Sequence, residues 1–238
     1  MATIAGLYAL TPDLLDTDEL VTRVAAAIAG GAAAVQYRNK IASPPLRRAQ
    51  ALVLRDLCAA QGITFIVNDD VNLAYAVDAD GVHLGRDDAP LIRARQRLGS
   101  TAIIGASCYD SLERAAAAIA SGADYVAFGS FFPSTVKPDA ARVEASLLAA
   151  AKARWNVSTV AIGGITPATA PALIAAGADA LAVVTALFDA PDVAAAAVMP
   201  PIATTETFQR AFAAVSSDGF AGTASGLTTD GKKLPNAM

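Results

Sequence analysis

Two short apolar runs of this chain both end in acidic residues. FIVN is followed by Asp69 and Asp70, and GVHL is followed, after Gly-Arg, by Asp87 and Asp88. Carboxylates that face each other repel, and the pKa of one of them rises unless a cation lies between them. Mg²⁺ suits such a place, because it takes one or two carboxylates and fills its other positions with water and phosphate oxygens. The pattern favours a Mg²⁺ site, although Asp69-Asp70 taken alone is more typical of a helix N-cap.

Basic residues follow a third apolar run at alternate positions. In VQYRNK, Gln36, Arg38 and Lys40 point to the same side if the strand geometry continues. Arginine grips a phosphate with a planar fork, whereas lysine acts as a point charge. Together with Lys137 and Mg²⁺, these residues describe a diphosphate site.

Glycine-rich turns predict a second anion site. AIGGIT and AVVTAL both follow apolar runs near the end of the strand-and-helix pattern, where backbone N–H groups and a helix N-terminus often hold a phosphate. The same AIGGIT turn is also compatible with tight packing alone. Two phosphate sites indicate two phosphorylated substrates.

The elements that must position these residues alternate along the chain. Continuous apolar runs predict strands that are buried on both faces. They lie at residues 6–10, 31–37, 64–68, 78–84, 102–107, 122–128, 159–164 and 177–183. Ala-rich segments between them have helical periodicity, and several begin at Pro or an Asp, Ser or Thr cap. They lie at residues 18–29, 44–61, 71–77, 90–98, 111–120, 140–154, 167–176 and 186–198.

Eight alternating strand and helix units predict an α/β fold, a single-domain (β/α)8 TIM barrel, with parallel strands and right-handed crossovers. An open doubly wound sheet is less favoured, because no GxGxxG loop follows the first strand. The catalytic barrel is expected over residues 1–199. Residues 200–238 form a Ser/Thr/Gly-rich tail, for which we expect one short helix and then a flexible end.

In such a barrel the chemistry lies at the carboxyl ends of the strands. The polar and glycine residues expected at that rim are Gln36, Arg38, Lys40, Asn68, Asp69, Asp87, Asp88, Ser107, Ser130, Ser134, Thr135, Lys137, Gly163, Gly164 and Thr185. His83 has no second histidine or cysteine nearby, so we interpret it as a hydrogen-bonded core or rim residue.

Composition narrows the classes of partner. The net charge of −4 gives no basic surface for nucleic acid, and no apolar segment is long enough to cross a bilayer. With one histidine and two cysteines, neither a zinc site nor a disulfide framework is expected. We predict a cytoplasmic protein with small-molecule substrates and no membrane or nucleic-acid partner; the sequence leaves its oligomeric state, including a homo-oligomer, open.

Seven motifs, in order, resemble those of the thiamine-phosphate synthase family over residues 5–192. They are GLYALTPD, VQYRNK, IVNDD, DGVHLGRDD, IIGAS, FPSTVK and AIGGIT with AGADALAVVTALF. The resemblance implies a (β/α)8 barrel that joins hydroxymethylpyrimidine (HMP) diphosphate to thiazole phosphate with Mg²⁺, giving thiamine phosphate and diphosphate. The resemblance further implies that loss of diphosphate leaves a resonance-stabilised pyrimidine cation, which the thiazole nitrogen captures, so no protein nucleophile is needed.

The resemblance also implies a role for each matching residue. HMP diphosphate would be bound by Gln36, Arg38, Lys40, Asn68, Ser107 and Lys137, of which Arg38, Lys40, Ser107 and Lys137 would be catalytic. Mg²⁺ would be bound by Asp69 and Asp88. Thiazole phosphate would be bound by Ser134, Thr135, Gly164, Val184 and Thr185.

One position departs from the family pattern. Val136 stands where the family loop usually has a second hydroxyl residue, so thiazole phosphate would lose one hydrogen bond unless Thr135 replaces it.

Two other functions remain open: a thiazole tautomerase, which shares the fold but generally lacks the residues for pyrimidine diphosphate, and a non-catalytic binding protein of the thiamine pathway. The pyrimidine-diphosphate and metal residues are retained, which argues against the tautomerase; they are Arg38, Lys40, Asn68, Asp69, Asp88 and Lys137.

Overall fold

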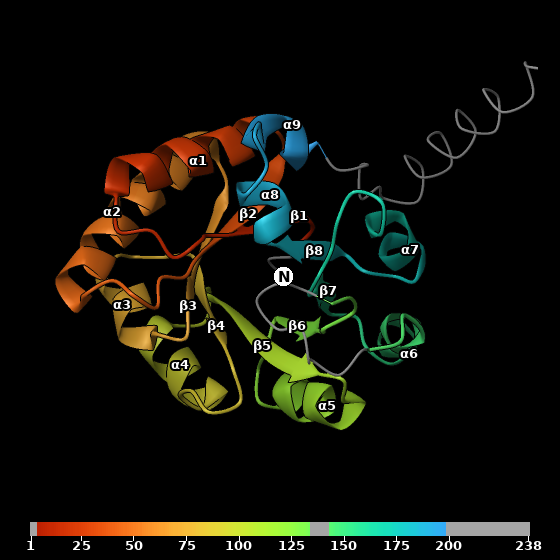
Figure 1. Cartoon of the computed structure of the whole chain (residues 1–238). Helices are drawn as coiled ribbons and strands as arrows, with labels where there is room; N and C mark the ends of the chain where they lie inside the picture. The colour runs from red at the N-terminus through yellow and green to blue at the C-terminus, as the bar shows by residue number, and fades with distance from the viewer. Residues whose placement is uncertain (1–3, 134–142, 199–238) are drawn as a thin grey trace, which may run out of the picture. The chain divides into compact units, whose positions relative to one another are not determined.

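The computed structural model describes residues 4–133 and 143–198. Within them, parallel strands form a closed barrel in the order β1 to β8, each paired with the next and β8 paired with β1 (Figure 1). The strands are β1 (Gly6–Leu10), β2 (Ala32–Tyr37), β3 (Thr64–Asn68), β4 (Gly81–Leu84), β5 (Ile103–Tyr109), β6 (Tyr125–Phe128), β7 (Ser158–Ile162) and β8 (Ala180–Val183). The predicted (β/α)8 barrel is therefore confirmed.

Helices alternate with these strands and surround the barrel (Figure 1). They are α1 (Thr17–Ala29), α2 (Pro44–Gln61), α3 (Val71–Ala76), α4 (Leu91–Leu98), α5 (Leu112–Ala120), α6 (Ser146–Arg154), α7 (Ala170–Ala175), α8 (Thr185–Phe188) and α9 (Val193–Ala197). None of the helices in the described ranges is long and apolar enough to cross a bilayer.

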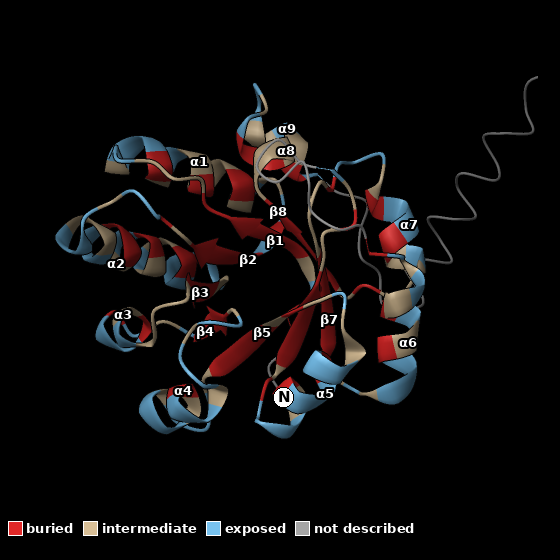
Figure 2. Ribbon diagram, turned by 60° about the horizontal axis from the view of Figure 1, so that its bottom comes forward, coloured by how far each residue is buried: buried red, intermediate tan, exposed pale blue. Residues whose placement is uncertain are grey.

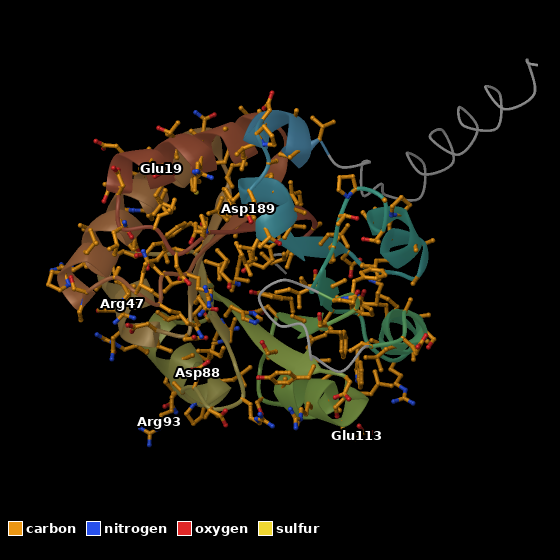
Figure 3. All side chains as sticks on the ribbon, viewed as in Figure 1. Glu19, Arg47, Asp88, Arg93, Glu113 and Asp189 are labelled. Atoms are coloured by element: carbon orange, nitrogen blue, oxygen red, sulfur yellow. The ribbon has the colours of Figure 1, made fainter. Side chains whose placement is uncertain are left out.

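The barrel has two apolar cores because its strands are buried on both faces. One lies between the strands and the helices and contains residues such as Leu20, Leu54 and Phe128. The other fills the barrel interior and contains Tyr8, Ile66 and Tyr125 among others. Figure 2 shows the buried strands inside helices whose outer faces are exposed. Charged side chains such as Glu19, Arg93 and Glu113 project from those outer faces (Figure 3).

The predicted final helix, residues 186–198, is wrong as a single element. The structure has two short helices instead, α8 and α9, separated by residues 189–192. Pro191 cannot supply the backbone N–H that a continuous helix requires. Asp192 starts the second helix, because its side chain accepts a hydrogen bond from the backbone N–H of Ala195 at 3.0 Å.

Two other predicted helices begin later in the structure. Helix α6 begins at Ser146 rather than at residue 140, and α7 begins at Ala170 rather than at residue 167. In α7, Pro171 lies in the first turn, where its missing N–H costs no intrahelical hydrogen bond. Residues 200–238 lie outside the described ranges, so the predicted division into barrel and tail stays a prediction.

Strand register decides which residues share a level of the rim. Leu10 of β1 lies opposite Gln36 of β2, and Asn68 of β3 lies opposite His83 of β4. Ser107 of β5 lies opposite Ala127 of β6. All the strands are parallel, so their carboxyl ends face the same side, and the polar residues at those ends are gathered at one mouth of the barrel.

Candidate active site

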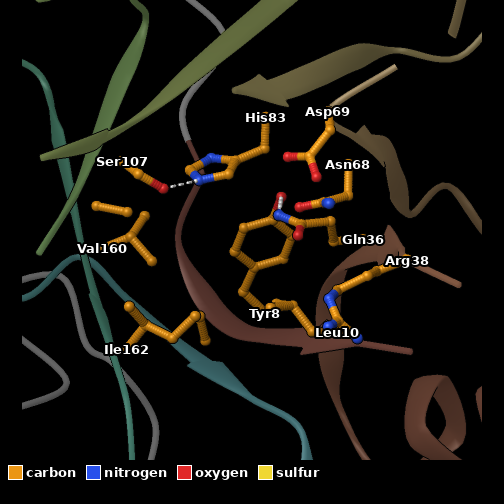
Figure 4. Close-up of a pocket in the computed structure, with 12 residues that line it drawn as sticks. Tyr8, Leu10, Gln36, Arg38, Asn68, Asp69, His83, Ser107, Val160 and Ile162 are labelled. Carbon is orange, nitrogen blue, oxygen red and sulfur yellow. Dashed lines mark hydrogen bonds between the residues drawn. The ribbon is translucent and has the colours of Figure 1, made fainter. Parts of the chain in front are cut away.

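A cavity of about 150 Å³ lies at the carboxyl ends of the strands (Figure 4). Five of its lining residues are ones that the sequence placed at the rim: Gln36, Arg38, Asn68, Asp69 and Ser107. The other lining residues are Tyr8, Leu10, His83, Ala127, Val160, Ile162 and Ala182. The cavity is therefore polar on the side of β2 to β5 and largely apolar on the side of β6 to β8.

The two adjacent acids after β3 have different roles. Asp70 is the N-cap of α3, because its side chain accepts a hydrogen bond from the backbone N–H of Leu73 at 2.9 Å. Asp69 has the unusual φ of +64°, and its own N–H donates to the carbonyl of His83 at 2.8 Å. This left-handed conformation turns the Asp69 carboxyl into the cavity instead of along the helix. The N-cap interpretation thus holds for Asp70 only.

The acids after β4 are also divided. The side chain of Asp87 is 88% exposed and lies 3.6 Å from the guanidinium of Arg86. Asp88 instead folds back, and its Oδ2 accepts a hydrogen bond from the backbone N–H of Gly85 at 2.6 Å. In this position Asp88 is close enough to the Asp69 carboxyl group to raise its pKa. The structure therefore brings Asp69 and Asp88 together, as expected from the strand ends.

The pKa of the Asp69 carboxyl is raised from its ordinary value of 3.8 to about 6, mainly because partial burial disfavours the charged form and also because Asp88 lies nearby. The nearby Lys40 ammonium and the Asn68 side chain oppose that rise in pKa. Two carboxyl groups so close together are an unfavourable arrangement when both are ionised.

The donors present fit a hard cation. Asp69 and Asp88 offer carboxylate oxygens, the ligand type that Mg²⁺ prefers, and a cation between them would remove their repulsion. Within residues 4–133 and 143–198 there is no group of three or more His, Cys, Asp or Glu side chains that could hold a metal ion. A Mg²⁺ bound here would accordingly take its remaining ligands from water and substrate phosphate.

Asp13 in the loop after β1 organises the basic residues after β2. Its Oδ2 lies 3.0 Å from Nη1 of Arg38, and its Oδ1 accepts a hydrogen bond from the backbone N–H of Lys40 at 2.7 Å. The side chain of Thr11 bonds both backbone groups of Arg38 at 2.8 Å. These contacts hold the Arg38 fork at the cavity. Asp13 was not predicted as a site residue, although it lies in the GLYALTPD motif.

The glycine turn after β7 is closely packed. Gly163 and Gly164 have φ of +102° and +62°. A Cβ atom on Gly164 would lie 2.4 Å from the carbonyl oxygen of Pro133, and one on Gly163 would lie 2.0 Å from the Oγ of Ser130. The packing interpretation of AIGGIT is therefore correct for both glycines, and a phosphate-binding role for Gly164 stays a prediction.

The turn after β8 leads directly into a helix. Val184 is the N-cap of α8, and Thr185 is its first residue. The first N–H groups of a helix have no intrahelical partner, so they are available to an anion at the rim.

Three residues of the predicted site, Ser134, Thr135 and Lys137, lie in the segment 134–142, outside the described residues. Val136, which departs from the family pattern, lies in the same segment. Their expected contacts with the two phosphates stay predictions.

A series of hydrogen-bonded polar side chains, most of which line the cavity, was not predicted from the sequence. Tyr8 and Tyr125 bond to each other through their hydroxyls at 2.9 Å, and Gln36 Nε2 donates to the Tyr8 hydroxyl at 2.8 Å. His83 contacts Tyr125 at 3.0 Å and Ser107 at 2.9 Å through its two ring nitrogens (Figure 4 shows the contact with Ser107). Burial lowers the pKa of His83 to about 4, so the ring is neutral. The interpretation of His83 as a hydrogen-bonded core residue is confirmed.

Comparison with known proteins identifies the family that this chain resembles in sequence. The family model described as thiamine monophosphate synthase matches residues 7–187. The thiamine-phosphate synthase of Thiobacillus denitrificans is 57% identical over 192 residues, which cover 81% of this chain and 91% of the relative. That of Chromobacterium violaceum is 56% identical over 194 residues, covering 82% and 93%. Among solved structures, a thiamine phosphate pyrophosphorylase from Pyrococcus furiosus has a TM-score of 0.74 and 36% identity, covering 82% of this chain and 92% of that one.

Proposed function

This chain belongs to the thiamine monophosphate synthase family, and we infer on that basis that it is a transferase that joins HMP diphosphate to thiazole phosphate. The products are thiamine phosphate and diphosphate. The observation that carries this assignment is the joint lining of one cavity by Gln36, Arg38, Asn68, Asp69 and Ser107 in a chain that matches the family along the whole barrel. A tautomerase acting on the thiazole alone would not require this polar half of the rim.

The proposed diphosphate site lies over β2 to β4. Arg38 offers a planar fork at the cavity, and Lys40 adds a positive charge close enough to affect the pKa of Asp69. We assign Mg²⁺ to Asp69 and Asp88, where it would supply positive charge to the leaving diphosphate oxygens. Lys137 completes the proposed set of cations.

Catalysis in this proposal is electrostatic and positional. Departure of diphosphate moves negative charge onto the leaving group, which Arg38 and Lys40 stabilise, and leaves positive charge on the pyrimidine. The apolar side of the cavity, with Val160 and Ile162, excludes water that would otherwise compete with the thiazole nitrogen. The site holds the two substrates in line, so that they react as neighbours within one complex and not through a random bimolecular encounter.

The thiazole phosphate is assigned to the β6 to β8 side. Gly164, Val184 and Thr185 would present backbone N–H groups to it, with Ser134 and Thr135 adding hydroxyls. This assignment rests on the resemblance and on the position of α8 immediately after β8. It separates the two phosphates on opposite sides of one cavity.

The assay that tests the function mixes HMP diphosphate, thiazole phosphate and Mg²⁺ with the full-length chain and measures thiamine phosphate and released diphosphate. Omitting either substrate should abolish thiamine phosphate formation, and EDTA should abolish it until Mg²⁺ is restored. If the two substrates are not consumed under any of these conditions, the chain is a binding protein rather than an enzyme. Cytoplasmic location is part of the same proposal and is tested by cell fractionation.

A further inference from the structure

The barrel interior contains a continuous series of hydrogen bonds, and the proposed chemistry gives no role to its three central members, Tyr8, Tyr125 and His83. The series links side chains of β2, β1, β6, β4 and β5 in that order: Gln36, Tyr8, Tyr125, His83 and Ser107. The relative exposure of its first four members is 2%, 1%, 0% and 8%. Buried polar groups of this kind are costly unless each is satisfied, so the order of donors and acceptors along the series is strongly constrained.

That order follows from counting protons. Gln36 donates through Nε2 to the Tyr8 hydroxyl, so the single Tyr8 proton is left for Tyr125. Tyr125 then donates to His83 Nδ1, which must be unprotonated to accept. The opposite order would leave the buried Tyr8 proton without an acceptor among the residues that the structure describes.

Because Nδ1 accepts the Tyr125 proton, it carries no proton itself, and the N–H of the His83 ring lies on Nε2. That N–H donates to the Oγ of Ser107 at 2.9 Å. Because Ser107 already accepts this hydrogen bond, its own proton is free to point elsewhere, and Ser107 lines the cavity. We propose that Tyr8, Tyr125 and His83 are positioning residues that fix the Ser107 hydroxyl as a hydrogen-bond donor to the substrate in the cavity.

The surrounding backbone is shaped for this series. Gly105 of β5 lies between His83 of β4 and Tyr125 of β6 in the strand register. A Cβ atom on Gly105 would lie 2.0 Å from Cζ of Tyr125, so only glycine leaves room for the phenol to cross β5. The Tyr125 and His83 rings consequently stack with centroids 5.5 Å apart and an interplanar angle of 24°. Gly105, the glycine of the IIGAS stretch, is thus required for the contact between Tyr125 and His83.

Donation by Ser107 has a consequence that rests on the proposed function. A departing diphosphate gains negative charge, which a hydroxyl donor stabilises and a hydroxyl acceptor does not. Loss of the fixed direction should lower kcat/KM for HMP diphosphate by roughly 3- to 10-fold, which corresponds to about 0.7–1.4 kcal/mol, the value of one hydrogen bond.

The decisive experiment uses the single histidine of the chain. With ¹⁵N-labelled imidazole, NMR of the intact protein without substrate reports the tautomer of His83 without any assignment step. The expected result is one fixed tautomer, protonated on Nε2 and bare on Nδ1. A ring protonated on Nδ1, or a doubly protonated ring near neutral pH, would overturn the proposal, because Ser107 could then not be left as the donor to the cavity. Since no turnover is measured, this result is independent of whether the proposed activity is correct.

Two variants extend the test. Tyr125→Phe removes the donor to Nδ1 while keeping the ring, and it should convert the fixed tautomer into a mixture. Tyr8→Phe should also produce a mixture of tautomers, but to a smaller extent. This variant replaces Tyr125→Phe in the test if Tyr125→Phe does not fold. Tyr37→Phe is the matched control, since Tyr37 is also a buried tyrosine, but its hydroxyl donates to Gln50 at 2.9 Å outside the series. An Nε2–H tautomer that stays fixed in both series variants would contradict the proposed role of the tyrosines.

A double-mutant cycle separates positioning from general structural support. If Tyr125 acts through Ser107, then Tyr125→Phe should lower kcat/KM in the wild-type background and have little effect in the Ser107→Ala background. Equal penalties in both backgrounds would show that Tyr125 supports the barrel in another way and would overturn the proposal.

Discussion

The two halves of the barrel mouth are built differently. Between β2 and β5 the cavity is lined by side chains with charge or hydrogen-bonding groups: Gln36, Arg38, Asn68, Asp69, His83 and Ser107. Between β6 and β8 it is lined by small and apolar side chains: Ala127, Val160, Ile162 and Ala182. The first half carries its chemistry on side chains, whereas the second half can offer polar groups mainly from the backbone of its turns.

The two halves of the mouth should therefore be sensitive to different kinds of substitution. A side-chain group can be deleted by truncation, so the β2 to β5 half should respond to substitutions that remove charge or change its shape. Backbone N–H groups remain when a side chain is truncated, so a substitution can affect them only by moving the backbone. The β6 to β8 half should therefore respond to substitutions that alter backbone geometry, such as those at Gly163 and Gly164, both of which have positive φ.

The largest effect is expected from removing the paired acids. Asp69→Ala and Asp88→Ala should each lower kcat/KM by roughly 100-fold or more, because charge stabilisation by a bound metal is worth several kcal/mol. Circular dichroism and thermal unfolding should show an intact fold. Asp87→Ala is the matched control, since Asp87 follows the same strand but has an 88% exposed side chain. Near-wild-type turnover of either variant in EDTA-treated buffer would remove the metal assignment.

A change of shape at constant charge should have the next largest effect. Arg38→Lys should raise KM for HMP diphosphate by about 10-fold, because lysine cannot reproduce the planar fork and one hydrogen bond to a charged group is worth about 1.5–3 kcal/mol. KM for thiazole phosphate should change little. Arg48→Lys on the exposed face of α2 serves as the control. If Arg38→Lys matches wild type in both KM and kcat, Arg38 does not grip the diphosphate.

The β6 to β8 half is tested by a backbone change. Gly164→Ala should cost about 1–3 kcal/mol of stability, because φ is +62° and the new Cβ would meet the Pro133 carbonyl at 2.4 Å. The displaced turn should raise KM for thiazole phosphate severalfold, up to about 10-fold. Gly62→Ala is a close control: its φ is +68°, but nothing lies within 4 Å of the added Cβ. Equal effects of the two variants on this KM would show that strain alone, and not the site, is responsible.

The parts of the fold that the sequence predicted have strong local signals. Strand β3 and helix α2 were predicted to the residue, because a continuous apolar run and a Pro start with a Gly62 stop mark their limits. The final helix was predicted wrongly, because its Ala-rich periodicity continues past Pro191 and hides the break. Boundaries without such a signal, as at the start of α6, depend on packing that the sequence does not display.

The site was predictable where it depends on strand ends and unpredictable where it depends on register. Arg38 and Asp69 could be placed at the rim because parallel strands share one carboxyl edge. The passage of Tyr125 across Gly105 to His83 depends on which residues lie opposite one another, which requires the closed barrel. The ion pair of Asp13 with Arg38 depends on the path of a loop, which no periodicity describes.

The smallest expected effect is on the free energy of unfolding when no metal is bound between Asp69 and Asp88. The pKa of the Asp69 carboxyl is about 6 in the folded chain and has an ordinary value of 3.8. A raised pKa means that the folded chain binds this proton more tightly than the unfolded chain does. The favourable contribution is therefore fully present below about pH 4 and is lost as the pH rises through about 6.

Asp69→Asn removes this ionisation, so in EDTA the variant should gain stability relative to wild type between about pH 4 and about pH 8. The full shift would correspond to about 3 kcal/mol, but the side chain is only partly buried, and solvent screening reduces the expected gain to roughly 1 kcal/mol. Urea unfolding at the two pH values measures it, with Asp87→Asn as the control. Excess Mg²⁺ at about pH 8 should reverse the order, because binding stabilises only the chain that keeps both carboxylates. A pH-independent difference between variant and wild type would show that the pKa of Asp69 is not raised in solution, so that neither burial nor Asp88 makes its ionisation unfavourable when the metal is absent.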